Sequence, residues 1–329
     1  MPGVASGHAG SQPGLAIRRT APYGRMRTVA TVLGIDVGGT KVAVARIEGA
    51  EAHDAVEHPT NLDSPEELLD GISAAVEEVG GSPDAVGVGV PSQVEFATGT
   101  VLSSVNIPLE GVPLREELGR RFGIPVFVDN DANCAALAEA QLVPDPPAEH
   151  LVMLTLGTGV GGGIVIDGRI ERGHSGLGAE MGHVIVDGEV ALGATEPGFP
   201  RPGSLEWICS GTGLERAATE AAGTRVSGRE AVKAAEGGDE RMLEVFERHG
   251  RWLGLGIAGL VNTFEPEHVV IGGGLSRAAD LFLATACEEA ARNALPALWA
   301  RATVSLARGG AGAGVIGAGV LAAQELERA

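Results

Sequence analysis

Lysine is almost absent from this chain of 329 residues, which contains only Lys41 and Lys233. Asp and Glu number 43 against 24 Lys and Arg, so the formal net charge is −19. Because nucleic-acid binding depends on clustered basic side chains that neutralise phosphates, this balance argues against nucleic acid as a partner. A nucleotide would have to be held by backbone N–H groups, arginine and metal ions, which makes the glycine-rich loops candidate binding sites.

Cysteines and long apolar runs are scarce as well. The three cysteines, Cys134, Cys209 and Cys287, form no CxxC pair, which predicts a reducing cytoplasm and no thiolate metal site built from near neighbours. No run of about 18 uncharged apolar residues is present, so we expect no membrane partner. Residues 1–27 lack the pattern of a signal peptide and are rich in Gly, Ser, Pro and Ala, so we expect a disordered extension, or a true start at Met26.

Glycine is abundant, and three glycines at 157, 159 and 162 have the GxGxxG spacing of dinucleotide-binding proteins. In those proteins the glycines end a strand and open a helix. Here the β-branched run Ile164-Val165-Ile166 follows, which predicts a second strand. The segment 151–170 is therefore expected to be a hairpin with a glycine turn, which argues against a Rossmann oxidoreductase.

The same arrangement occurs near the start of the chain, where apolar runs at 32–37 and 42–47 flank Gly38, Gly39 and Thr40. A hairpin that occurs twice predicts two similar α/β halves that face each other. Between the hairpins we expect a helix with Ser64 as its N-cap, a strand, an irregular stretch, a second helix, and a strand that leads directly into a third helix. In that order, the six elements are expected at residues 64–79, 85–91, 92–106, 112–123, 124–130 and 131–142. Farther on we expect a strand, a glycine turn and a helix within 267–295, and an amphipathic helix over 313–329.

The two glycine turns carry a chemical hypothesis. Glycine lets an anion approach the backbone closely, and Asp36 beside the first turn could hold Mg²⁺ directly or through water. Two such loops facing each other would grip a triphosphate from both sides. The alternative for each loop alone is a simple tight hairpin turn.

Four segments together, DVGGTK, VFVDNDANCAALAE, GLGAEMGHVIVD and VVIGGG, resemble the ROK family of sugar kinases within the actin-like and hexokinase-like ATPases. The resemblance runs from about Val32 to the C-terminus. It implies a two-domain α/β fold with ribonuclease H-like halves and a central cleft. The implied domains are 28–143 with 311–329, and 144–310.

The resemblance also implies the roles of single residues. Asp131 would be the catalytic base, and its place between a strand and a helix would favour the ionised form, although a simple helix N-cap is the alternative. The sugar would contact Asn106, Asn130, Asp131, Glu180, His183 and Glu206. ATP would contact Asp36, Gly38, Gly39, Thr40, Lys41, Gly157, Thr158, Gly159, Gly272, Gly273 and Gly274, with Mg²⁺ on Asp36.

One part of the pattern departs from the family. There the histidine matched by His183 usually binds zinc together with three loop cysteines, but this chain has Pro197, Phe199 and Ser204 at the cysteine positions and retains Glu206. A structural zinc needs four ligands, and proline and phenylalanine offer none, so we expect no zinc.

These observations predict an ATP-dependent kinase that phosphorylates a hexose, most simply the 6-hydroxyl of glucose. Mannose, fructose, N-acetylmannosamine and another amino sugar remain open as substrates. A sugar-sensing regulator without a DNA-binding module is a second, weaker hypothesis. We expect a cytoplasmic homodimer.

Overall fold

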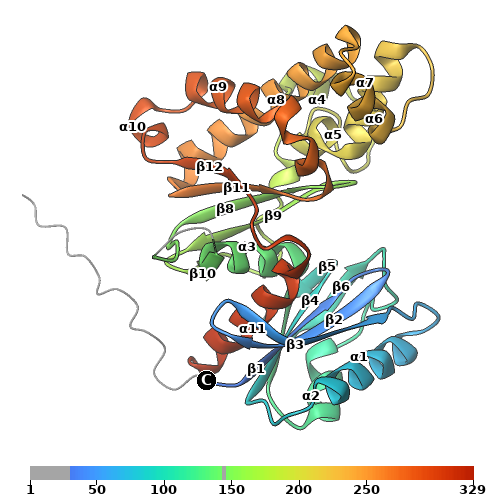
Figure 1. Cartoon of the computed structure of the whole chain (residues 1–329), viewed down its shortest axis with the longest axis vertical. Coiled ribbons are helices and arrows are strands. Elements are labelled where there is room, and N and C mark those ends of the chain that lie inside the picture. The colour runs from blue at the N-terminus through green and yellow to red at the C-terminus, as the bar shows by residue number, and fades with distance from the viewer. Residues whose placement is uncertain (1–29, 143–145) are drawn as a thin grey trace, which may run out of the picture.

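The computed structural model describes residues 30–142 and 146–329. The predicted extension over 1–27 falls outside these residues. Two five-stranded sheets form the frame of the molecule (Figure 1). The first has the order β3-β2-β1-β4-β7, and the second has the order β10-β9-β8-β11-β12.

The strands of the first sheet are β1 (Val32–Val37), β2 (Lys41–Glu48), β3 (Glu51–Pro59), β4 (Ala85–Val90) and β7 (Val126–Asn130). Those of the second are β8 (Leu151–Leu156), β9 (Val160–Ile166), β10 (Arg169–Ile170), β11 (His268–Gly272) and β12 (Thr303–Leu306). In each sheet a hairpin is followed by two parallel strands, since β1 pairs antiparallel with β2 and parallel with β4, and β8 pairs likewise with β9 and β11. The prediction of two similar halves is confirmed.

Helices cover both faces of each sheet. On the first sheet, α1 (Pro65–Val79) and α2 (Leu114–Phe122) pack one face, and α11 (Ala313–Leu326) packs the other. Against the second sheet, α3 (Asp131–Leu142) lies on the inner face. The outer layer consists of α4 (Gly188–Gly193), α5 (Leu205–Cys209), α6 (Gly211–Ala222), α7 (Gly228–Glu236), α8 (Glu240–Phe264), α9 (Leu283–Asn293) and α10 (Pro296–Trp299). None of the helices in the described ranges has the length and apolar character needed to cross a bilayer.

Several predictions about single elements are confirmed and others are wrong. The N-cap is confirmed, because Ser64 Oγ accepts a hydrogen bond from Glu67 N at 3.2 Å. The stretch expected to be irregular contains a short hairpin, β5 (Ser92–Glu95) and β6 (Thr100–Ser104), and strand β3 was not predicted. The helix expected after the third glycine turn begins as a 3₁₀ segment over 274–281 before α9.

The C-terminal helix is confirmed, but its predicted amphipathic character is wrong. Its buried residues are Ala313, Val315, Gly317, Ala318, Gly319, Val320, Leu321, Ala322 and Ala323, which lie on all sides of the helix. The physical reason is that α11 lies between the first sheet and α3, so it has no broad face for solvent (Figure 1).

Glycines allow α11 to approach the first sheet at backbone distance. A Cβ atom placed on Gly34 of β1 would lie 1.8 Å from the carbonyl oxygen of Val315. One placed on Gly87 of β4 would lie 1.7 Å from the carbonyl oxygen of Ala318. Any side chain at these two strand positions would therefore push the helix off the sheet.

Glycines also allow close contact of α3 with α11 on one side and with the second sheet on the other. A Cβ atom on Gly317 of α11 would lie 1.6 Å from the carbonyl oxygen of Cys134 in α3. One on Gly163 of β9 would lie 2.6 Å from the Cβ of Ala136, also in α3. The layers thus follow one another as first sheet, α11, α3 and second sheet, and a glycine allows close packing at each boundary between them.

We expect Gly317→Ala to lower the free energy of unfolding by about 1 to 3 kcal/mol, because the added methyl group overpacks the contact between α11 and α3. Gly259 in α8 is a matched control, since it is also helical but exposed, and nothing lies within 4 Å of an added Cβ. Gly259→Ala is expected to raise that free energy by about 0.5 to 1 kcal/mol. Urea titrations of both variants measure the difference, and equal effects would contradict the packing argument.

Candidate active site

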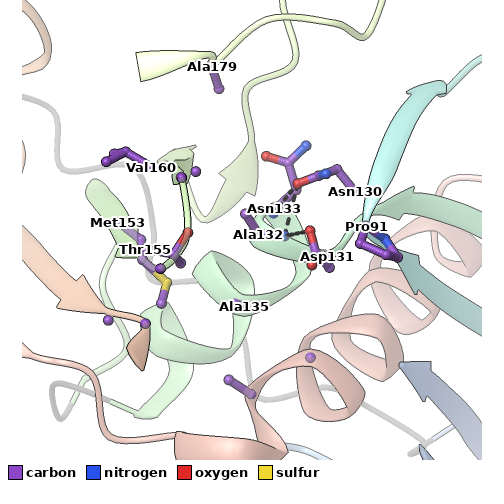
Figure 2. Close-up of a pocket in the computed structure, with 18 of the residues that line it drawn as sticks. Pro91, Asn130, Asp131, Ala132, Asn133, Ala135, Met153, Thr155, Val160 and Ala179 are labelled. Atoms are coloured by element: carbon purple, nitrogen blue, oxygen red, sulfur yellow. Dashed lines mark hydrogen bonds between the residues drawn. The ribbon is translucent and has the colours of Figure 1, made fainter. Parts of the chain in front are cut away.

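A cleft of about 950 Å³ opens between the two halves. Eleven of the residues predicted from sequence line it: Asp36, Asn106, Asn130, Asp131, Gly157, Gly159, Glu180, Glu206, Gly272, Gly273 and Gly274. Figure 2 shows Asn130 and Asp131 on one side of this cleft and Thr155 and Val160 on the other. The structure therefore brings together residues that are up to 238 positions apart, from Asp36 to Gly274.

The remaining predicted residues do not line the cleft: Gly38, Gly39, Thr40, Lys41, Thr158 and His183. Lys41 Nζ is paired with Glu57 on β3. The first glycine turn is closed by a hydrogen bond from Gly38 N to Lys41 O at 2.9 Å. A Cβ on Gly39 would lie 3.6 Å from the carbonyl oxygen of Asn106, so this turn borders the cleft at the Asn106 wall.

Two carboxylates, those of Asp36 and Asp131, lie within electrostatic range of each other in the cleft. Asp36 stands near the end of β1, and Asp131 is the first residue of α3. Burial raises the pKa of Asp36, an effect partly offset by Lys41. Burial and the neighbouring charge of Asp36 raise the pKa of Asp131 to about 6. Backbone hydrogen bonds at the start of the helix lower this pKa, as expected, but burial and Asp36 raise it by more.

Helix capping at α3 is done by Asn130. Its Oδ1 accepts hydrogen bonds from Ala132 N at 2.9 Å and Asn133 N at 3.4 Å, and its Nδ2 donates to Ser92 O at 3.2 Å. Asp131 Oδ1 accepts a hydrogen bond from Ala132 N at 2.8 Å. Because Asn130 occupies the N-cap position, Asp131 is not needed as a cap, and its carboxylate is available at the cleft wall.

The second glycine turn is held from behind by the start of α6. Gly211 N donates to Gly157 O at 2.7 Å, and Thr212 Oγ1 donates to Thr158 O at 2.9 Å. From α5, Glu206 Oε2 accepts a hydrogen bond from Val160 N at 2.7 Å. Gly211 and Thr212 were not predicted from the sequence. Their only signal was the Ser-Gly-Thr-Gly run at the start of α6.

Glu180 lines the cleft, and its partner His183 lies behind this lining. Glu180 Oε2 is 4.0 Å from His183 Nε2. The Nδ1 atom of His183 is buried and has no hydrogen-bond partner among the described residues. The ring of Phe199 meets the imidazole edge-on with centroids 5.3 Å apart.

The side chains around His183 do not fit a zinc site. Phe199 and Pro197 offer no donor atom, and Ser204 uses its Oγ to accept from Trp207 N at 3.2 Å as the N-cap of α5. The nearest cysteine in sequence, Cys209, is buried and donates to the carbonyl of His249 at 3.8 Å. In the part of the chain that the structure describes, no three His, Cys, Asp or Glu side chains are grouped so that they could hold a metal ion without further ligands.

Other cleft residues have no counterpart in the sequence analysis. Arg277 follows the third glycine turn and is the one basic side chain among the described residues that line the cleft. Glu139 of α3 is fully buried and accepts hydrogen bonds from Arg308 N and Gly309 N, so it fixes the segment that leads back to α11. A single buried acidic residue in an Ala-rich helix was the available signal for Glu139.

We expect the Asp131 carboxyl to titrate with a pKa of about 6 in the folded protein, well above that of an ordinary aspartate. Asp36→Asn removes the neighbouring negative charge, which is one of the two causes of the raised pKa, and should move the titration midpoint of Asp131 to lower pH. ¹³C NMR of labelled aspartate, with Asp131→Asn to assign the resonance, measures both values. A midpoint near 4 in the unmodified protein, or no change in Asp36→Asn, would contradict the coupling of the two carboxylates.

Known proteins resemble this chain over most of its length. The ROK family model matches residues 32–325. A glucokinase of Halalkalibacterium halodurans is 34% identical over 320 residues, which cover 89% of this chain and 95% of that protein. An N-acetyl-D-glucosamine kinase of Vibrio parahaemolyticus is 34% identical over 74% of this chain and 84% of that protein.

Solved structures agree with this assignment. The ROK hexokinase of Thermus thermophilus has a TM-score of 0.82 and 35% identity, over 90% of this chain and 99% of that one. A ROK glucokinase of Streptomyces griseus, in complex with glucose and AMPPNP, has a TM-score of 0.71 and 31% identity over 89% of this chain and 99% of that one. The predicted actin-like fold is confirmed, and the chain belongs to the ROK family.

Proposed function

We propose that the protein is an ATP-dependent sugar kinase that transfers the γ-phosphate to a hexose hydroxyl, in the simplest case the 6-hydroxyl of glucose. The observation that carries this proposal is the Asp131 carboxylate, with its pKa raised to about 6, at the wall of a cleft whose other wall is made of glycine turns. The glucokinases and hexokinase among the relatives support the same activity, and the complex with AMPPNP supports ATP as the donor.

The proposed role of Asp131 follows from its pKa. At pH 7 to 8 the carboxylate is mostly ionised and can accept a proton, while its raised pKa makes it a stronger base than an ordinary aspartate. It would orient the sugar hydroxyl and take its proton as the oxygen attacks the γ-phosphorus and the bond to ADP breaks. Because phosphoryl transfer has a loose transition state, orientation matters more than early removal of the proton.

The sugar would lie between the two halves. We assign Asn106, Asn130 and Asp131 from the first half, with Glu180, His183 and Glu206 from the second, as its hydrogen-bonding groups. The Asn130 amide is already engaged in capping α3 and bonding Ser92, so it is held in a fixed orientation toward a ligand. Glu206 is bonded to Val160 N beside the second glycine turn, which would bring sugar and phosphate into contact.

ATP would occupy the part of the cleft lined by the glycine turns. We assign its phosphates to the N–H groups around Gly157–Gly159, to the turn at Gly38–Lys41 and to Arg277, and its adenosine to the side of Gly272–Gly274. We assign Mg²⁺ to Asp36, whose carboxylate lines the cleft and would hold the ion. Such an ion, when bound, would neutralise charge on the phosphates.

The domain assignment, 28–143 with 311–329 and 144–310, remains part of this proposal. The halves would close about the two chain crossings between them, which are 143–150 and the segment before α11. Residues 143–145 fall outside the described residues. Closure would exclude water, which competes as phosphoryl acceptor.

The identity of the sugar is the open part of the proposal. The N-acetyl-D-glucosamine kinase of Vibrio parahaemolyticus has the same 34% identity to this chain as the Halalkalibacterium halodurans glucokinase, over 74% of the chain against 89%. Amino sugars and N-acetylated hexoses, including N-acetylmannosamine, therefore belong in any substrate screen beside glucose, mannose and fructose.

A sugar panel with ATP and Mg²⁺, monitored by ADP release, tests the proposal. We expect turnover with at least one hexose, and a loss of about 100- to 10,000-fold in kcat for Asp131→Asn, because general base catalysis contributes that much. The matched control is Glu267→Gln, whose carboxylate bonds the backbone of residues 149–150 outside the cleft. No ADP release with any sugar would contradict the kinase assignment, and an active Asp131→Asn would remove Asp131 from the mechanism.

A further inference from the structure

An ion pair links the two halves beside the cleft. Arg172, which follows β10 of the second sheet, donates from Nε to Asp129 Oδ2 at 2.7 Å, and Asp129 lies on β7 of the first sheet. Their side chains are only 12% and 3% exposed. Neither residue lines the cleft, so the pair does not contact a bound substrate directly.

The other oxygen of Asp129 fixes the start of α3. Asp129 Oδ1 accepts hydrogen bonds from Asn130 N and from Asn133 Nδ2, both at 2.8 Å. These two residues flank Asp131 in the sequence. One carboxylate therefore joins the strand end and the first helical turn around the proposed base to a cation from the opposite half.

Arg172 is itself held on the first half. Its guanidinium carbon lies 3.6 Å from the centre of the Phe96 ring, a cation–π geometry. Arg115 of α2 donates to the carbonyl oxygens of Phe96 and Ala97 and so fixes the segment that carries the ring. Asp129 therefore bonds an edge of the guanidinium while Phe96 covers one of its faces, so Arg172 is held from two directions.

The same residue also anchors the segment that leads to Glu180. Gly178 N donates to Arg172 O at 2.9 Å, which closes the segment 172–178 into a loop. Within that loop, a Cβ on Gly176 would lie 3.0 Å from Phe96 N, so the loop backbone packs directly on the first half. Glu180 on one side of the cleft and Asp131 on the other are thus located by contacts of Arg172.

We infer that Arg172 is a positioning residue that sets the distance between the sugar-binding segment of the second half and the Asn130-Asp131 pair of the first. This inference rests on the proposed kinase function. By this inference the second half of the protein helps to position the base, Asp131, which lies in the first half. An ion pair formed within one half could not link the two halves in this way. The sugar side of the site should depend on Arg172, and the ATP side should not.

Comparison of a single and a double charge variant separates an effect on the position of the site residues from an effect on the stability of the fold. Arg172→Gln alone leaves a buried carboxylate without its cation, so it is expected to lower the melting temperature as well as activity. The double variant Arg172→Gln with Asp129→Asn removes both charges and should recover most of the melting temperature. In the double variant we expect kcat/KM for the sugar to stay about 10- to 100-fold below that of the unmodified protein, because misplacing a reacting group lowers the rate by about this factor. The KM for ATP should be unchanged within about twofold.

Hydrogen exchange supplies a readout besides activity. In the double variant the amides of residues 130–133 should exchange faster than in the unmodified protein. Arg251→Gln, which removes an exposed pair with Glu247 in α8, is the matched control and should change neither measurement. A double variant with recovered kcat/KM for the sugar, or with unchanged protection at 130–133, would overturn the inference. If the unmodified protein phosphorylates no sugar, the kinase proposal fails while the exchange data still test Arg172.

Discussion

The structure depends on the close contact of helix α11 with its neighbours on both sides. Gly34 and Gly87 let α11 touch the first sheet through backbone atoms, and Gly317 lets it touch α3 in the same way. Because α11 is buried on all sides, its position determines how far apart the two sheets stand. At its start, Gly314 lies against Asp36, where an added Cβ would be 2.5 Å from the carboxyl carbon, so the same packing forms the floor of the cleft.

This packing has an electrostatic consequence. Asp36 near the end of β1 and Asp131 at the start of α3 belong to layers on either side of α11. Burial in the cleft raises the pKa of both, and the charge of Asp36 raises that of Asp131 further. Arg277 is the one basic side chain among the described residues that line the cleft. In the proposed complex, the ATP phosphates would therefore be bound largely by backbone N–H groups of the glycine turns.

Local patterns account for what the sequence predicted correctly. β-branched runs around glycine turns identified both hairpins, and the run from β7 into α3 placed Asp131 at a strand-to-helix junction. The hairpin β5–β6 was missed because its short strands are rich in Ser and Thr and lack a strong alternation. The pair Arg172–Asp129 could not be predicted, since it joins positions 43 apart on different halves and has no periodic signal. The burial of α11 was missed for a related reason: a helix between two layers needs small residues on every side, and this weakens the contrast between its faces.

In the proposed function each half carries only part of the site, and closure of the halves would bring sugar and ATP together. Small-angle X-ray scattering with and without saturating sugar measures this closure. We expect a smaller radius of gyration with sugar, and a reduced response in Glu180→Ala that retains nucleotide binding. An unchanged scattering profile at saturating sugar, with catalysis intact, would contradict closure and favour a preformed site.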